Sequence, residues 1–150
     1  MLSKILSKSE CASCKFCCSF RRKSLWETPI FTKTEVEKIQ NNREEYCMLA
    51  AEKFNTICVL KGHNTVVSDG NDVYINKTGN SSLAKAGSGD VLTGVISGFA
   101  AQGYTLFQSA VLGVYLHGLC GEIASQDLTE YSVLASDLLK YIPFGIKNLM

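Results

Sequence analysis

Hydrophobic residues recur at helical spacing in two adjacent segments near residue 40. In residues 43–54, Tyr46, Leu49, Ala50 and Phe54 fall close to one face, which predicts an amphipathic helix. An earlier helix is expected to start near residues 32–34, because Thr32 and Thr34 each have a glutamate three positions on, and to run to about residue 40. The pair Asn41-Asn42 should separate the two helices.

Two kinds of strand pattern follow. Residues 56–60 form a short, nearly all-apolar run rich in β-branched side chains, which predicts a strand buried on both faces of a sheet that helices cover. Residues 65–68 and 73–76 flank the turn sequence Asp-Gly-Asn-Asp, a strong hairpin signal. About three strands are therefore expected.

Helical patterns return after a loop of small residues at 79–89. We expect helices over about 90–102, ended by Gly103, and over about 105–126. A third helix is expected over 132–141, stopping before Pro143. The order of elements predicts an α/β fold with few strands, a β-hairpin and at least three helices.

Composition narrows the functional classes. The chain has 150 residues, 46% of them hydrophobic, and a net charge of +1. These values suit one domain with a real core and argue against disorder. The low net charge gives no general attraction to nucleic acid or to anionic membranes. No uninterrupted apolar run reaches the ~18 residues of a membrane span, and no secretory signal is evident, so a cytoplasmic location is expected.

The loop before the third helix is the main candidate for chemistry. Gly87, Ser88 and Gly89 lead directly into a helix predicted to start at Asp90. Glycines allow a sharp turn and a close backbone approach, and a helix N-terminus offers N–H groups to phosphate, which makes these three residues a candidate anion hole. Asp90 could accept a proton from a hydroxyl group beside that phosphate. Equally, Asp90 could simply cap the helix.

A longer string of residues resembles the C-terminal signature of the NAD(P)H-hydrate dehydratases, which are members of the ribokinase-like superfamily. The resemblance covers about residues 43–150, and the form Ala-Gly-Ser-Gly-Asp resembles the ADP-using branch. The matching segments are Val59–Gly62, Thr78–Asn80, Leu83-Ala84, Ala86–Gly94, Ala101–Gly103, Gly113–Gly118 and Ala135–Leu138. It implies a ribokinase-like α/β fold, present only as its C-terminal portion.

The resemblance also implies a reaction. The family repairs the S-epimer of hydrated NADH and NADPH, using ADP and Mg²⁺ and releasing AMP and phosphate. Asp90 would contact the hydrate hydroxyl as the catalytic base, and Gly89 with the adjoining N–H groups would hold phosphate. The nucleotide would contact the loop made of Lys61, Gly62, His63, Asn64 and Thr65. Family members often assemble, which implies a homo-oligomer.

Other polar residues are interpreted as structural. His117 lies in an apolar helical segment, where a packed histidine is the preferred interpretation, and Asp137 is interpreted as a helix cap. Cys47, Cys58 and Cys120 are scattered on predicted core faces, as packed thiols are.

The N-terminal segment is of a different kind. Residues 1–40 are basic near their start and carry the motif Cys-x-x-Cys-x-x-Cys-Cys, formed by Cys11, Cys14, Cys17 and Cys18. The motif resembles the start of small cysteine-cluster proteins that chelate zinc or iron, so these four residues are candidate metal ligands. Reduced thiols without a metal are the alternative. We therefore expect a junction between residues 31 and 45, with a partial dehydratase domain at 43–150.

Two further functions remain open on the sequence. The shared Gly-x-Gly-Asp motif also allows a ribokinase-like kinase that phosphorylates a small alcohol. The chain could instead be an inactive fragment, or a fusion with a metal-binding cysteine segment.

Overall fold

The computed structural model describes residues 33–149, and the chain divides into two compact units, Met1–Arg43 and Glu44–Met150. In the first unit the described structure is helix α2 (Lys33–Asn41), which is largely exposed. Its end is marked by Asn42, whose side-chain amide donates a hydrogen bond to the Lys38 carbonyl at 3.2 Å. Helix α3 (Arg43–Phe54) follows directly. The predicted break at Asn41-Asn42 is confirmed.

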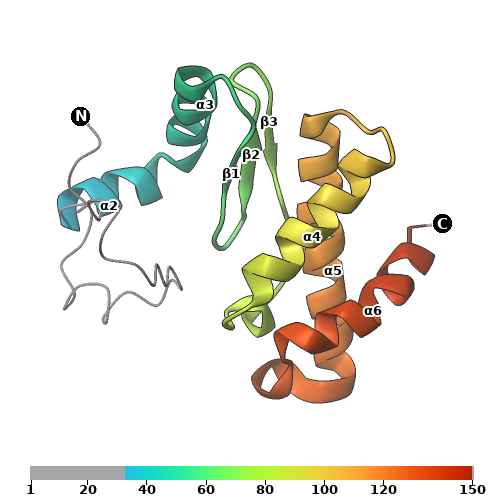
Figure 1. Ribbon diagram of the computed structural model, residues 1–150. Helices are drawn as coiled ribbons and strands as arrows, with labels where there is room; N and C mark the ends of the chain where they lie inside the picture. The colour runs from blue at the N-terminus through green and yellow to red at the C-terminus, as the bar shows by residue number, and fades with distance from the viewer. Residues whose placement is uncertain (1–32, 150) are drawn as a thin grey trace, which may run out of the picture. The chain divides into compact units, whose positions relative to one another are not determined.

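The second unit contains a small antiparallel sheet in the order β1-β2-β3, seen beside α3 in Figure 1. The strands are β1 (Cys58–Leu60), β2 (Val66–Ser68) and β3 (Val73–Ile75). The predicted hairpin is confirmed as β2 and β3. The Asp69 carboxylate holds its turn by accepting hydrogen bonds from the N–H groups of Asn71 and Asp72 at 2.9 and 2.7 Å.

The prediction of which strand is buried was wrong. All three residues of β2 are buried, whereas those of β1 are half-buried. β2 is the central strand and is hydrogen-bonded to β1 on one side and to β3 on the other, while β1 lies at an edge of the sheet. A β-branched apolar run therefore marks a strand here without marking its place in the sheet.

Three helices pack together after the sheet. They are α4 (Ser88–Ala101), α5 (Leu106–Ser132) and α6 (Ala135–Lys147), and a short 3₁₀ helix, η1 (Ser81–Leu83), precedes them. Both α4 and α6 lie against the long α5 (Figure 1). One core cluster joins the sheet to α4 and α5; its buried members are Val67, Leu92, Ala110 and Val114.

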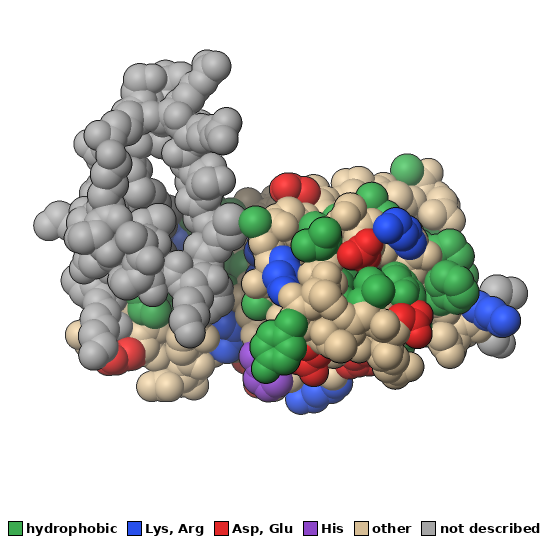
Figure 2. Space-filling model, turned by 90° about the horizontal axis from the view of Figure 1, so that it is seen from below, with side chains coloured by type: hydrophobic (Ala, Val, Ile, Leu, Met, Phe, Trp, Pro, Cys, Tyr) green, Lys and Arg blue, Asp and Glu red, His purple; other side chains and the backbone are tan. Residues whose placement is uncertain are grey.

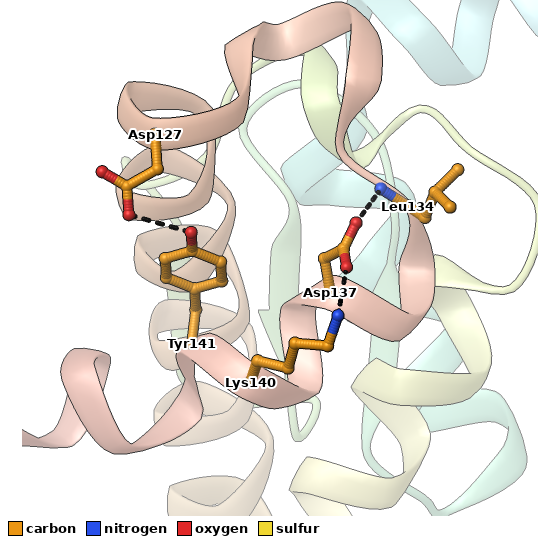
Figure 3. Close-up of polar contacts among 5 residues, drawn as sticks. All are labelled: Asp127, Leu134, Asp137, Lys140 and Tyr141. Carbon is orange, nitrogen blue, oxygen red and sulfur yellow. Dashed lines mark hydrogen bonds and ion pairs between the residues drawn. The ribbon is translucent and has the colours of Figure 1, made fainter.

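A second core cluster joins α5 to α6 through buried Ala124, Val133 and Leu138. Polar contacts surround it, as Figure 3 shows: the Asp137 carboxylate accepts hydrogen bonds from the Leu134 N–H at 3.0 Å and from Lys140 at 2.9 Å, which holds its pKa below the ordinary value. The Tyr141 hydroxyl donates to Asp127 at 2.8 Å (Figure 3). Asp137 thus closes the first turn of α6.

The prediction that the last helix stops before Pro143 was wrong, because α6 continues through this residue to Lys147. A proline removes the N–H that would bond to the carbonyl four residues earlier, here that of Leu139. Leu139 and Pro143 are both exposed, so water can bond to the Leu139 carbonyl.

On the face drawn in Figure 2, hydrophobic side chains reach the surface in patches between charged ones.

Helix α5 is long and apolar enough, by length and composition alone, to cross a membrane. Core helices pass the same test, and half of its most apolar window is buried inside the protein. Its contacts with α4 and α6 are those of a core helix.

The loop between β3 and η1 is fastened along α5. The Asn76 side-chain amide donates to the carbonyls of Thr78 and Val114 at 3.0 and 3.2 Å, and the Thr78 hydroxyl donates to the Tyr115 carbonyl at 2.8 Å. The Gly79 N–H donates to Glu122 at 2.7 Å. These bonds hold the start of the small-residue loop in place.

Candidate active site

The first turn of α4 is formed by the glycine-rich segment that the sequence singles out. Gly87 is the N-cap and has a φ of +85°, a left-handed conformation that glycine adopts without strain. The helix begins at Ser88, two residues before the predicted start. Gly89 and Asp90 therefore lie within the first turn rather than ahead of it.

The backbone N–H groups of this turn are not equivalent. The Ser88 N–H donates to the Lys85 carbonyl at 3.3 Å, and the Asp90 N–H donates to the Gly87 carbonyl at 3.1 Å. The Gly89 N–H donates to no acceptor within the described part of the chain. Of the N–H groups of Ser88, Gly89 and Asp90, that of Gly89 is thus the one most available to a bound anion.

A lysine from the sheet reaches the same turn. Lys61 directly follows β1, and its Nζ lies 2.7 Å from the point that a Cβ on Gly89 would occupy. A side chain at position 89 would therefore collide with the ammonium group. An ammonium group close to the N-terminus of a helix is an arrangement that suits a bound anion.

A hollow of about 280 Å³ opens beside this pair. Its polar lining consists of Lys61, Gly89, Thr93 and Ser97, and its apolar lining consists of Val59, Leu92 and Ile96. Asp90 is exposed in the first turn of α4 and is not part of the lining. The hollow combines a lysine ammonium group, a helix N-terminus and an apolar wall.

The rest of the expected nucleotide loop forms a tight turn. The Thr65 hydroxyl donates to the Gly62 carbonyl at 3.0 Å, and Asn64 has a positive φ of 53°. His63 and Asn64 are exposed. Of the five expected loop residues, Lys61 lines the hollow and the other four do not.

His117 is buried, as its structural interpretation predicts, but it also touches the candidate site. Its Nε2 lies 3.0 Å from the Ser88 carbonyl oxygen and 3.1 Å from the Ser88 hydroxyl oxygen. Burial lowers the pKa of His117, the bond to Ser88 opposes that shift, and the nearby charge of Lys61 adds to it. The ring is therefore neutral at neutral pH.

Two polar residues of the hollow, Thr93 and Ser97, were not predicted from the sequence. Thr93 and Ser97 follow Gly89 at steps of four, which places them on one face of α4. The Thr93 hydroxyl donates to the Gly89 carbonyl at 2.9 Å. The four-residue spacing from Gly89 could have identified Thr93 and Ser97 from the sequence, because it places them on the same helix face as Gly89.

The described residues contain no cluster of three or more His, Cys, Asp or Glu side chains that could hold a metal ion. The candidate ligands Cys11, Cys14, Cys17 and Cys18 lie outside those residues. Cys47 and Cys120 are buried, as predicted for packed thiols. Cys58 is free and half-buried.

Cys47 modifies its neighbour. Its Sγ lies 3.5 Å from the carbonyl oxygens of both Cys58 and Val66, so it connects α3 to β1 and β2. Hydrogen bonding from this thiol lowers the pKa of Cys58 to about 7, against the opposing effect of burial. Burial instead raises the pKa of Cys120 to about 11.

We therefore expect iodoacetamide to alkylate Cys58 well before Cys120, with a rate that rises with pH and is half-maximal near pH 7. Peptide mass spectrometry measures each site separately. In a Cys47→Ala variant the half-maximal pH at Cys58 should move up toward about 8.5, the value of an unperturbed thiol. An unchanged profile in that variant would contradict the assignment.

Comparison with known proteins identifies the relatives of this arrangement. A family model described as NAD(P)H-hydrate dehydratase matches residues 27–144. The chain belongs to this family. The match begins ahead of residue 43, where the resemblance in the sequence begins, and it includes α2.

Curated dehydratases are similar to much of the chain. It is 44% identical over 118 residues to a bifunctional NAD(P)H-hydrate repair enzyme of Moorella thermoacetica, covering 77% of this chain and 22% of that protein. It is 38% identical over 114 residues to the ADP-dependent (S)-NAD(P)H-hydrate dehydratase of Bacillus subtilis, covering 75% of this chain and 41% of the relative. The chain thus spans less than half of either relative.

Solved structures confirm the α/β, ribokinase-like fold as a partial one. The ADP/ATP-dependent NAD(P)H-hydrate dehydratase of Bacillus subtilis, co-crystallised with ATP/Mg²⁺, matches with a TM-score of 0.74 and 34% identity over 81% of this chain and 44% of that one. A ribokinase-like superfamily protein of Enterococcus faecalis matches with a TM-score of 0.56 and 28% identity, covering 79% and 37%. These similarities favour dehydratase ancestry over a small-alcohol kinase.

Proposed function

We propose that this chain carries the nucleotide and phosphate site of an ADP-dependent NAD(P)H-hydrate dehydratase, which converts the S-epimer of hydrated NADH or NADPH back to the reduced nucleotide. The observation that carries the proposal is the close approach of Lys61 to Gly89 in the first turn of α4, the turn that also contains Asp90. The family supplies the substrate class.

In the proposed mechanism the ring hydroxyl of the hydrate attacks the terminal phosphorus of ADP. Asp90 accepts the hydroxyl proton, while Lys61 and the Gly89 N–H stabilise charge on the phosphoryl oxygens. AMP departs. Hydroxide is a poor leaving group, whereas the phosphate formed on the ring leaves readily as the C–O bond breaks. The neighbouring ring carbon then loses a proton to water, and the ring double bond forms.

The donor set suits a magnesium ion that arrives with the nucleotide. The described residues offer no all-protein cage, and Asp90 supplies a single carboxylate in the same turn of α4 as Gly89. Magnesium in nucleotide sites is commonly bound by one or two carboxylates, phosphate oxygens and water. When bound, it would neutralise phosphate charge, and Asp90 is the described residue placed to contact it.

The direct test combines purified protein with hydrated NADH, ADP and Mg²⁺ and follows the appearance of NADH. The proposal predicts NADH, AMP and phosphate in equal amounts, and no NADH when ADP is omitted. The same mixture with small alcohols in place of the hydrate tests the kinase alternative. Failure to form NADH from the S-epimer would contradict the proposed activity.

Lys61→Met should weaken ADP binding by about 10- to 100-fold, the usual cost of losing one charge-assisted hydrogen bond. Methionine keeps much of the side-chain length and removes the charge. Isothermal calorimetry measures the affinity, and Lys140→Met serves as the control because Lys140 pairs with Asp137 on α6. Equal affinities in the two variants would remove Lys61 from the site.

A further inference from the structure

The turn that holds the Gly89 N–H is anchored from behind by a buried histidine. His117 on α5 is 7% exposed, and Ser88 on α4 is 4% exposed. A carbonyl oxygen can only accept a hydrogen bond, so the 3.0 Å contact between Nε2 and the Ser88 carbonyl favours the tautomer with its proton on Nε2. The Ser88 hydroxyl oxygen lies 3.1 Å from the same nitrogen.

The anchor acts on a flexible piece of backbone. Ser88 stands between two glycines, which restrict the chain less than any other residue. Gly87 is already in a left-handed conformation, and the available N–H belongs to Gly89. A bond that fixes Ser88 to α5 therefore limits the directions in which the Gly89 N–H can point.

The anchor also adds no charge. The imidazole is neutral because it is buried and lies near Lys61, so its contribution to an anion site is geometric. The positive charge at the site comes from Lys61 and the helix N-terminus. The two functions, charge and orientation, are thus carried by different residues.

We propose that His117 is a positioning residue that, as the Nε2–H tautomer, orients the anion-binding turn of α4 through Ser88. The inference deepens the proposed function and rests on it for the identity of the anion. The orientation of the turn itself can be measured without any ligand.

A matched pair of variants tests the anchor. His117→Gln keeps an N–H donor near the position of Nε2, whereas His117→Met keeps side-chain length and removes the donor. We expect His117→Met to weaken ADP binding by about 3- to 10-fold, the effect of one neutral hydrogen bond, and to lower the NMR order parameter of the Gly89 N–H bond. His117→Gln should restore both measurements to near wild-type values.

Cys120→Ala separates orientation from general stability. Cys120 is buried on the same helix, and its sulfur lies 3.0 Å from the point that a Cβ on Gly145 would occupy, in α6. This control should lower the thermal midpoint while leaving ADP affinity and the Gly89 order parameter unchanged. A wild-type order parameter at Gly89 in His117→Met, or an equal effect in Cys120→Ala, would overturn the inference.

The wild-type protein gives an independent measurement should His117→Met fail to fold. Nitrogen-15 NMR of the imidazole should show a proton on Nε2 and none on Nδ1 at neutral pH. The opposite tautomer, or a charged ring, would overturn the inference. Absence of ADP binding by the wild type would instead contradict the proposed function, and the tautomer and the Gly89 order parameter would still decide the role of His117.

Discussion

Asp90→Asn is expected to lower the turnover of hydrated NADH by about 100- to 10,000-fold, the range for losing a general base, while ADP affinity measured without Mg²⁺ stays near the wild-type value. Asparagine has the shape of aspartate but cannot accept the hydroxyl proton. The affinity should persist because Asp90 does not line the hollow next to Lys61. Single-turnover assays and calorimetry measure the two quantities separately.

Asp137→Asn is the matched control, since it removes the same charge from the first turn of α6. Asp137 accepts hydrogen bonds from the Leu134 N–H and from Lys140 (Figure 3), so its loss should lower stability and leave turnover intact. Asp90 would be a mere helix cap if Asp90→Asn behaved in the same way, with reduced stability and normal turnover.

Elements defined by local signals were predictable from the sequence. Helix α3 begins at Arg43 and ends at Phe54, as predicted, because an Asn-Asn pair precedes it and Asn55 follows it. The β2–β3 hairpin followed from Asp69-Gly70, whose turn is closed by the side chain of Asp69 itself. In both cases neighbouring residues supply the stabilising contacts.

Features decided by distant contacts were not predictable in the same way. β1 has the more apolar sequence, but β2 is the central strand, and strand order depends on pairing across the whole sheet. α6 continues past Pro143 because its exposed side allows water to replace a lost bond. A local pattern does not contain this information.

The residues of the candidate site also differ in whether the sequence could predict them. The glycine-rich turn and Asp90 are adjacent in sequence, so a motif identifies them. The contact of Lys61 with Gly89 depends on how β1 packs beside α4, and that of His117 with Ser88 on how α5 packs behind it. The family resemblance assigned a role to Lys61, whereas it covered His117 without assigning it one.

The loop between β3 and η1 packs closely against α5, and this packing predicts a large loss of stability when Gly118 is replaced. Gly118→Ala should lower the free energy of unfolding by about 1–3 kcal/mol or more, as overpacking does. A Cβ at this position would lie 2.7 Å from the Thr78 carbonyl carbon and oxygen, which are backbone atoms. Relieving this overlap would stretch the bond from the Thr78 hydroxyl to the Tyr115 carbonyl.

Gly98→Ala makes the same chemical change on α4, where no atom lies within 4 Å of the new Cβ. There alanine should stabilise the protein by about 0.5–1 kcal/mol, because it favours the helix more than glycine does. Urea denaturation should therefore move the two midpoints in opposite directions. A shared direction would show that helix propensity, rather than the contact with Thr78, sets the cost at Gly118, and that the loop is free to move away from α5.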